Sequence, residues 1–167
     1  VSRRETAAFS AHIKHFFDPQ VMRKYRPDYV SVDEYKRRVN SNMARASLLN
    51  AASLSWQSPM ESPRLRFEKR DEASFVNGIT EAQKAAAKLE PRMDRLFEII
   101  KEGEKDREKE TVLRWQAGYD LAYGRVIATK VRTQAYNAML AAAKSGRLKF
   151  KDKKSNVWVL KPSDEVS

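Results

Sequence analysis

The feature that most constrains the fold is the apolar spacing of one long segment, residues 111–144. Its apolar and aromatic residues recur at alternating intervals of four and three, the repeat of a long α-helix that packs along another helix. The segment ends at Ser145-Gly146, which is typical of a helix C-terminus. The seam consists of Trp115, Tyr119, Ala122, Val126, Thr129, Thr133, Tyr136 and Leu140. We predict that this helix is the centre of the domain.

The same segment carries a second apolar stripe and several small residues. Glycine costs a helix about 1 kcal/mol relative to alanine, so we expect Gly118 and Gly124 where neighbouring backbones approach closely. The second stripe consists of Tyr123, Ile127, Val131, Ala138 and Ala142. We therefore expect this helix to be covered from several sides, with no cleft along residues 115–140 in which chemistry could occur.

Two further long helices are expected, over residues 32–56 and 72–102. Ser31 and Glu34 have the S-x-x-E spacing of a capping box and place the start of the first helix. Pro91 falls inside the second helix, where a proline costs about 3 kcal/mol unless the helix kinks. The apolar seam of the second helix consists of Ala82, Ala86, Leu89, Met93, Leu96 and Ile100. This seam keeps its phase, so we expect a kink at about Glu90 within one helix.

The remaining segments are shorter, and together they define the expected fold class. Two Ser-Pro steps make residues 57–70 an extended connector, and the almost entirely charged residues 101–110 suit a solvated helix end or a helix–helix connection. Alternating residues near the C-terminus predict a small hairpin. The sequence thus predicts a mainly α protein, an antiparallel bundle of three long helices. Its parts are an N-terminal helical arm (1–30), a bundle core (31–146), a β-hairpin packed on the bundle (147–161) and a flexible tail (162–167).

Length and composition exclude several classes of protein. The chain has 167 residues and no cysteine, which rules out thiol catalysis, thiolate zinc sites and disulfides. No apolar run approaches the roughly 20 residues needed to cross a bilayer. The chain begins at Val1 without an initiator Met or a signal-type apolar core, and we interpret it as a fragment of a longer protein.

No motif of an active site or a metal centre is present in the sequence. His12, His15 and Asp18 are spaced by three on an expected helix, but without a fourth ligand a helix surface is the favoured interpretation. The acidic pair Asp33-Glu34 is explained by a helix N-terminus. No phosphate-binding glycine loop or nucleophile motif occurs. We expect no catalytic residues, no metal ligands and no cofactor.

Positive charge is the one compositional indication of a partner, because 33 Lys and Arg face 22 Asp and Glu. A basic surface attracts phosphates, and this attraction weakens as salt rises. The basic residues are spread along the chain except in one dense C-terminal block, where an aromatic ring is available for stacking. The candidate polyanion-binding residues are Lys144, Arg147, Lys149, Lys151, Lys153, Lys154 and Trp158. Edge protection by lysines on an exposed strand, or simple solubility, is the favoured alternative.

A resemblance to a known group covers nearly the whole chain and is densest in residues 115–126, 130–133 and 136–141. These segments resemble the region C-terminal to the A-type domain in bacterial von Willebrand factor A domain-containing proteins. The metal-ion-dependent adhesion motif of that group belongs to the A domain, and this chain has no D-x-S-x-S motif. The resemblance therefore implies an accessory module and brings no functional residues with it.

We expect a non-enzymatic interaction module that adjoins a von Willebrand A-type domain. Its expected partner is the adjacent domain of the same parent chain or another protein. The alternative is an accessory nucleic-acid or polyanion-binding domain that uses the basic C-terminal hairpin. The alternative requires binding to nucleic acid or another polyanion that weakens steeply as the salt concentration rises.

Overall fold

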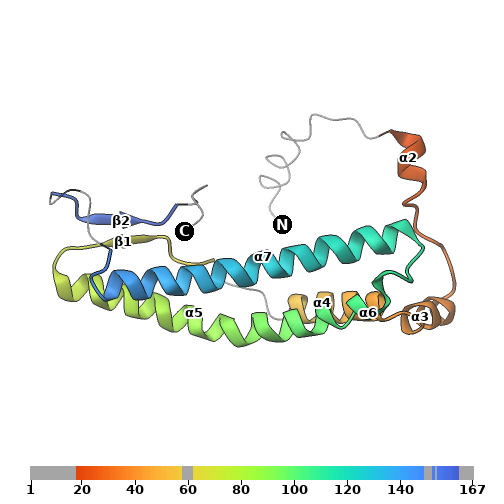
Figure 1. Cartoon of the computed structure of the whole chain (residues 1–167), viewed down its shortest axis with the longest axis horizontal. Helices are drawn as coiled ribbons and strands as arrows, with labels where there is room; N and C mark the ends of the chain where they lie inside the picture. Colours follow the sequence, from red (N-terminus) through yellow and green to blue (C-terminus); the bar gives the residue numbers. More distant parts are fainter. Residues whose placement is uncertain (1–17, 58–61, 149–151, 153, 162–167) are drawn as a thin grey trace.

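The computed structural model describes residues 18–57, 62–148, 152 and 154–161 (Figure 1). The expected N-terminal arm is described from Asp18 onward, and the histidines at 12 and 15 lie outside the described residues. In chain order the elements are α2 (Pro19–Arg23), α3 (Val32–Asn40), α4 (Met43–Gln57), β1 (Arg66–Glu68), α5 (Glu72–Lys101), α6 (Glu104–Arg107), α7 (Leu113–Lys144) and β2 (Val157–Val159). None of the helices in these ranges is long and apolar enough to span a membrane.

The two long helices α5 and α7 form an antiparallel pair along the length of the molecule (Figure 1). The short helix α6 joins them at one end, and α4 packs against both near that end. The two-stranded sheet lies at the opposite end of the pair (Figure 1). The fold is therefore mainly α with a small antiparallel sheet, which confirms the predicted fold class.

The predicted seam of α7 forms its buried face, but the second stripe does not. Tyr119, Val126 and Leu140 are buried against the other elements. Val131, from the second stripe, is 56% exposed, and Ile127 is also exposed. The expectation that α7 is covered from several sides is wrong for these two residues, although Tyr123 of the same stripe packs against the core and stacks on Phe97 of α5.

The helix α5 continues through Pro91 as a single element of 30 residues. Its course changes direction near its middle in Figure 1. Met93, Leu96 and Ile100, which follow the proline, are buried on the same seam as Ala82 and Ala86, which precede it. The apolar seam thus offsets the backbone hydrogen bond that the proline removes.

The helix expected over residues 32–56 is divided into α3 and α4. Asn42 lies between them, and its side-chain oxygen accepts hydrogen bonds from the backbone N–H groups of Ala44 (2.9 Å) and Arg45 (3.3 Å). This is the bonding pattern of an N-cap, so α4 begins as a new helix. The expectation of one uninterrupted helix is corrected by this cap.

The C-terminal strand forms where a strand was expected, and its partner comes from the connector between α4 and α5. The strands β1 and β2 pair antiparallel, with Phe67 opposite Trp158. Both rings pack with Phe75 and Leu140 in a cluster that joins the sheet to α5 and α7. The sheet therefore closes the far end of the helix pair, and the strand expected at residues 148–150 lies largely outside the described residues.

Candidate binding groove

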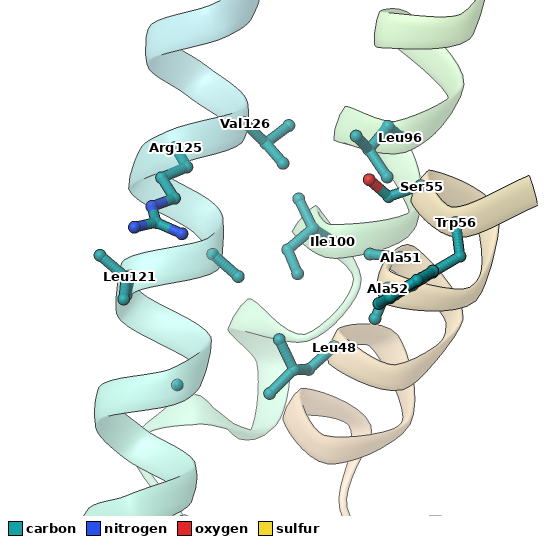
Figure 2. A pocket seen from close by; sticks show the side chains of 12 residues that line it. Leu48, Ala51, Ala52, Ser55, Trp56, Leu96, Ile100, Leu121, Arg125 and Val126 are labelled. Atoms are coloured by element: carbon teal, nitrogen blue, oxygen red, sulfur yellow. The ribbon is translucent and has the colours of Figure 1, made fainter. Parts of the chain in front are cut away.

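A groove opens between α4 and α7, and α5 forms its floor (Figure 2). Its volume is about 360 Å³. Leu96 and Ile100 of α5 lie at the bottom, between the two walls (Figure 2). From the sequence we expected no cleft for chemistry along this part of α7, and an open apolar groove was not anticipated.

Small residues on the two walls explain why the groove stays open. On α4 the wall consists largely of Ala51, Ala52 and Ser55, and on α7 it includes Gly118 and Ala122. At one level the helices do meet, since a β-carbon added to Gly118 would lie 3.5 Å from Leu48 Cδ2. Further along the walls, the short side chains leave the space between the helices unfilled.

The rim of the groove carries large apolar side chains that are exposed. Trp56, at the end of α4, is 88% exposed, and Leu121 on α7 is 57% exposed. Figure 2 shows Trp56 on one wall, and Leu121 with Arg125 on the other. Clustered exposed apolar residues around a concave apolar surface are typical of sites where proteins bind one another.

The charge of the walls is positive. Arg45 is the only charged residue of α4, and Asp120 is the only acidic residue of α7. Asp120 accepts a hydrogen bond from Arg107 Nε at 2.6 Å, away from the groove. Arg125 lines the groove and makes no ion pair with any described residue. An anionic group entering the groove therefore meets an available guanidinium.

Beneath the groove, where α6 connects α5 to α7, a set of residues that we name the α6 junction binds the helices together. It consists of Ala44, Arg45, Ser47, Gly103, Glu110 and Tyr119. The side chain of Glu110 is buried and accepts a hydrogen bond from Arg45 Nη2 at 2.8 Å. It also accepts one from the backbone N–H of Val112 at 2.8 Å, at the start of α7. The charged connection at 101–110 is thus partly buried, whereas the sequence indicated a solvated segment.

The titration of Glu110 reflects these contacts. Burial raises the pKa of its carboxyl group, but the hydrogen bonds from Arg45 and from the Val112 N–H outweigh burial. The net result is a pKa below the usual value of 4.5. Glu110 therefore stays ionised at neutral pH and acts as the anchor of Arg45.

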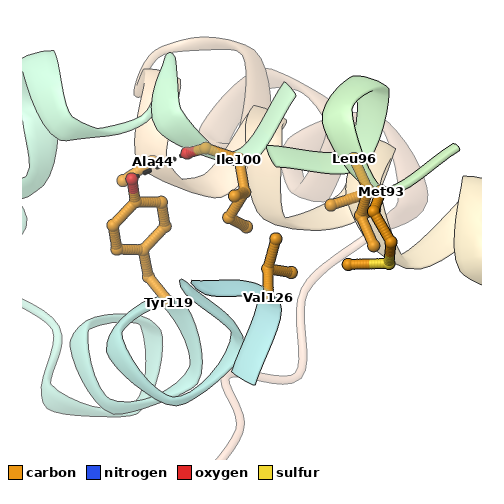
Figure 3. Close-up of a cluster of buried hydrophobic side chains, with 7 residues drawn as sticks. Ala44, Met93, Leu96, Ile100, Tyr119 and Val126 are labelled. Atoms are coloured by element: carbon orange, nitrogen blue, oxygen red, sulfur yellow. Dashed lines mark hydrogen bonds between the residues drawn. The ribbon is translucent and has the colours of Figure 1, made fainter. Parts of the chain in front are cut away.

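Tyr119 and Gly103 complete the α6 junction through close packing, and Figure 3 shows Tyr119 beside Ile100 and Ala44. The Tyr119 hydroxyl donates a hydrogen bond to the carbonyl oxygen of Ile100 at 2.7 Å, and burial raises the pKa of Tyr119 to about 12. A β-carbon on Gly103 would overlap Ser47 Oγ and the Tyr119 ring, and would lie 2.9 Å from Ala44 Cα. Only a glycine fits here, where the connection between α5 and α6 passes close to α4 and the Tyr119 ring.

The polar groups of the α6 junction are used for structure. Within the described ranges, no buried side-chain nitrogen or oxygen lacks a hydrogen-bond partner. The same part of the chain contains no cluster of His, Asp or Glu side chains arranged to hold a metal ion. The groove, and not the junction, is therefore the candidate site for a ligand.

The predicted polyanion-binding residues are only partly described. Lys144 at the end of α7, Arg147 and Lys154 are exposed. Trp158 packs against Phe67 and Phe75 in the cluster beneath the sheet. Lys149, Lys151 and Lys153 lie outside the described residues. Polyanion binding by this block stays a prediction, with salt-dependent binding to DNA as its test.

Comparison with protein-family models, with curated proteins and with solved structures finds no match to this chain. The groove is therefore interpreted from its own residues.

Sequence reasoning missed the groove because its walls were assigned to the core. One signal was present, since Leu121 is a large apolar residue that belongs to neither predicted stripe of α7. Trp56 gave a second signal, because a tryptophan at the end of a helix has fewer neighbours to cover it. Neither residue reveals from sequence alone that the two lie on opposite rims of one groove.

Proposed function

We propose that this chain is a non-enzymatic interaction module that binds a helical segment of a neighbouring domain or protein in the groove between α4 and α7. A helix laid between these walls would cover the floor formed by α5. It would also cover the exposed rings and methyl groups of the rim. The module thereby positions its partner without chemical change.

The observation that carries this proposal is the exposure of Trp56 and Leu121 on the two rims of an apolar groove. Tryptophan residues contribute strongly to binding when a partner covers them. The rest of the core supports the same view, because Ile100 on the groove floor and Tyr119 in the α6 junction are already buried within the chain. The exposed rim is thus not needed to close the fold.

The proposed neighbour is a von Willebrand A-type domain of the parent chain. Support comes from the resemblance of residues 115–141 to the region that follows such a domain. The same stretch of α7 supplies one wall of the groove. On this proposal, the resembling segment carries both the fold and the contact surface.

The test uses the 167-residue chain and the A-type domain of the parent protein, expressed separately. Binding is measured by isothermal titration calorimetry for the wild type and for Leu121→Asp. We expect the substitution to weaken binding at least about tenfold, because it places a carboxylate in an apolar contact. Unfolding curves of the two chains check that the fold is kept.

Met139→Asp is the matched control. Met139 is an exposed apolar residue of α7 that is 41% accessible. It lies 18 residues after Leu121, which is five helical turns and about 27 Å along the same side of the helix. Binding lost equally in both variants, or retained in Leu121→Asp, would contradict the groove as the contact surface.

A further inference from the structure

We propose that the partner held in the groove is an acidic amphipathic helix, with apolar residues facing α5 and carboxylates facing Arg125. This inference rests on the proposed function and names the chemistry of the partner. It follows from the charge of the walls, the dimensions of the groove and the exclusion of two other occupants.

Charge decides the polar part of the partner. Arg125 lines the groove without an ion pair among the described residues, and α4 contributes no carboxylate. Arg92 does not line the groove, but it is exposed on α5 one turn before Leu96 of the groove floor. A carboxylate near these guanidinium groups forms charge-assisted hydrogen bonds.

The acidic residues of α5 do not neutralise this surface. Asp94 is bound by Lys130, with 2.8 Å between Oδ1 and Nζ. Glu90 and Glu98 are six and two residues from Leu96, which places both on other faces of the helix. Arg125 is therefore the one charged side chain among the described residues that line the groove.

Dimensions decide the apolar part of the partner. The α4 wall runs from Leu48 to Trp56, which is nine residues, or about 12 Å of helix between the first and the last. Two turns of a partner helix have this length and present apolar side chains at positions i, i+4 and i+7. The small residues Ala52, Ser55 and Ala122 leave room for such side chains between the walls.

The same charge argues against a second copy of the chain as the occupant. The chain has a formal net charge of +11, so two copies repel one another. The walls of the groove add the same sign of charge on both sides of the contact. An acidic partner removes this repulsion and gains attraction in its place.

The N-terminal residues 1–17 are a less suitable occupant for the same reason. This segment contains Phe9, Ile13 and Phe16 at helical spacing, which matches the apolar requirement. Its charged residues are Arg3, Arg4 and Lys14 against Glu5, so it brings more positive charge to a positive groove. In the test below, a peptide of residues 1–17 is used as a competitor.

A displayed library of helical peptides tests the inference. Each peptide carries varied apolar residues at i, i+4 and i+7, and an equal mixture of Glu and Lys at the flanking positions. Selection uses the whole chain at about 150 mM salt, and peptides that also bind Leu121→Asp are discarded. We expect Glu to be enriched over Lys at least about tenfold in the groove-dependent peptides.

A charge exchange then locates the contact. The best acidic peptide and its Glu-to-Lys counterpart are titrated against Arg125→Glu. We expect the acidic peptide to bind this variant about tenfold more weakly and the basic counterpart to bind it more tightly. Lys36→Glu makes the same change in net charge on the exposed face of α3 and should alter either affinity less than about twofold.

Four outcomes separate the two proposals. Groove-dependent peptides without a preference for Glu overturn the acidic partner and leave the interaction module in place. A selection that yields no groove-dependent peptide overturns both. A synthetic peptide of residues 1–17 that displaces the best acidic peptide at equal concentration assigns the groove to that segment. A dimer seen by sedimentation of the wild type and lost in Leu121→Asp assigns the groove to a second copy of the chain. Each of these four results rejects the acidic partner.

Discussion

The helices α4 and α7 meet in two different ways along a few turns of their length. At the α6 junction, Gly103 lets the connection between α5 and α6 pass close to α4 and to Tyr119 of α7, and the Arg45–Glu110 pair closes the contact. At the groove, the walls carry Ala52 and Ser55 on α4 and Ala122 on α7, and the space between them is unfilled. Small residues therefore have opposite effects at the two places. One glycine permits close packing at the junction, and a run of small residues leaves the groove unfilled.

The difference follows from what surrounds each small residue. Gly103 is enclosed by Ala44, Ser47 and Tyr119, so neighbouring atoms fill the space that a side chain would occupy. Gly118 has Leu48 as its single close neighbour at 3.5 Å. We infer that the junction carries stability and the groove carries binding. Substitutions at the two places should therefore separate the two properties.

The largest loss of stability is expected for Glu110→Ala. The substitution leaves Arg45, which is 14% exposed, without its carboxylate, and it removes the acceptor for the Val112 N–H at the start of α7. Breaking a buried ion pair from one side costs roughly 3–5 kcal/mol. Urea denaturation should show this decrease in the free energy of unfolding.

Glu81→Ala is the control, because Glu81 forms an exposed pair with Lys84 and should lose less than about 1 kcal/mol. The Glu110 effect should also depend on pH. A carboxyl whose pKa is lower in the folded state contributes stability above its unfolded pKa, and the contribution disappears as pH falls through its folded pKa. The difference in the free energy of unfolding between the wild type and Glu110→Ala should thus become smaller below about pH 4.5. A difference in the free energy of unfolding that is as large at acidic pH as at neutral pH would contradict the ionic role of Glu110.

The next largest effect is expected for Gly103→Ala. The added methyl group meets Ser47, the Tyr119 ring and the Ala44 backbone, so the connection between α5 and α6 must move away from α4 and Tyr119. Overpacking of this kind costs typically about 1–3 kcal/mol. Thermal unfolding should reveal it as a lower midpoint.

Gly124→Ala provides the comparison for this substitution, because nothing lies within 4 Å of a β-carbon at that position. Alanine favours the helix over glycine by about 1 kcal/mol, so this variant should be slightly more stable than the wild type. Equal losses in the two glycine variants would show that Gly103 is not a packing contact.

Local spacing predicted much of the fold correctly. The seam of α5 from Ala82 to Ile100 is buried as expected, with Leu89 half-buried. The end of α7 at Gly146 is also as expected, since this residue has a φ of 73° that suits glycine. These features depend on neighbours within one or two turns, which the sequence displays directly.

The contacts between distant segments were not predictable in the same way. Trp158 pairs across the sheet with Phe67 from a connector, and no local pattern selects that partner. The Arg45–Glu110 pair likewise joins α4 to the start of α7. Glu110 ends a run of charged residues, so its sequence context indicates exposure, and only the crossing of helices buries it.

The smallest effect on stability is expected for Trp56→Ala, and it tests the groove side of the comparison. The ring is 88% exposed, so its removal leaves little cavity and should change the free energy of unfolding by less than about 0.5 kcal/mol. Trp158→Ala removes the same side chain from the cluster beneath the sheet, where it contacts Phe67 and Phe75, and should cost about 3 kcal/mol or more. The two variants should reverse their order in binding, because Trp56 lines the groove and Trp158 does not. A Trp56→Ala chain that unfolds as readily as Trp158→Ala would mean that the rim belongs to the core, and the separation between a stabilising junction and a binding groove would then be lost.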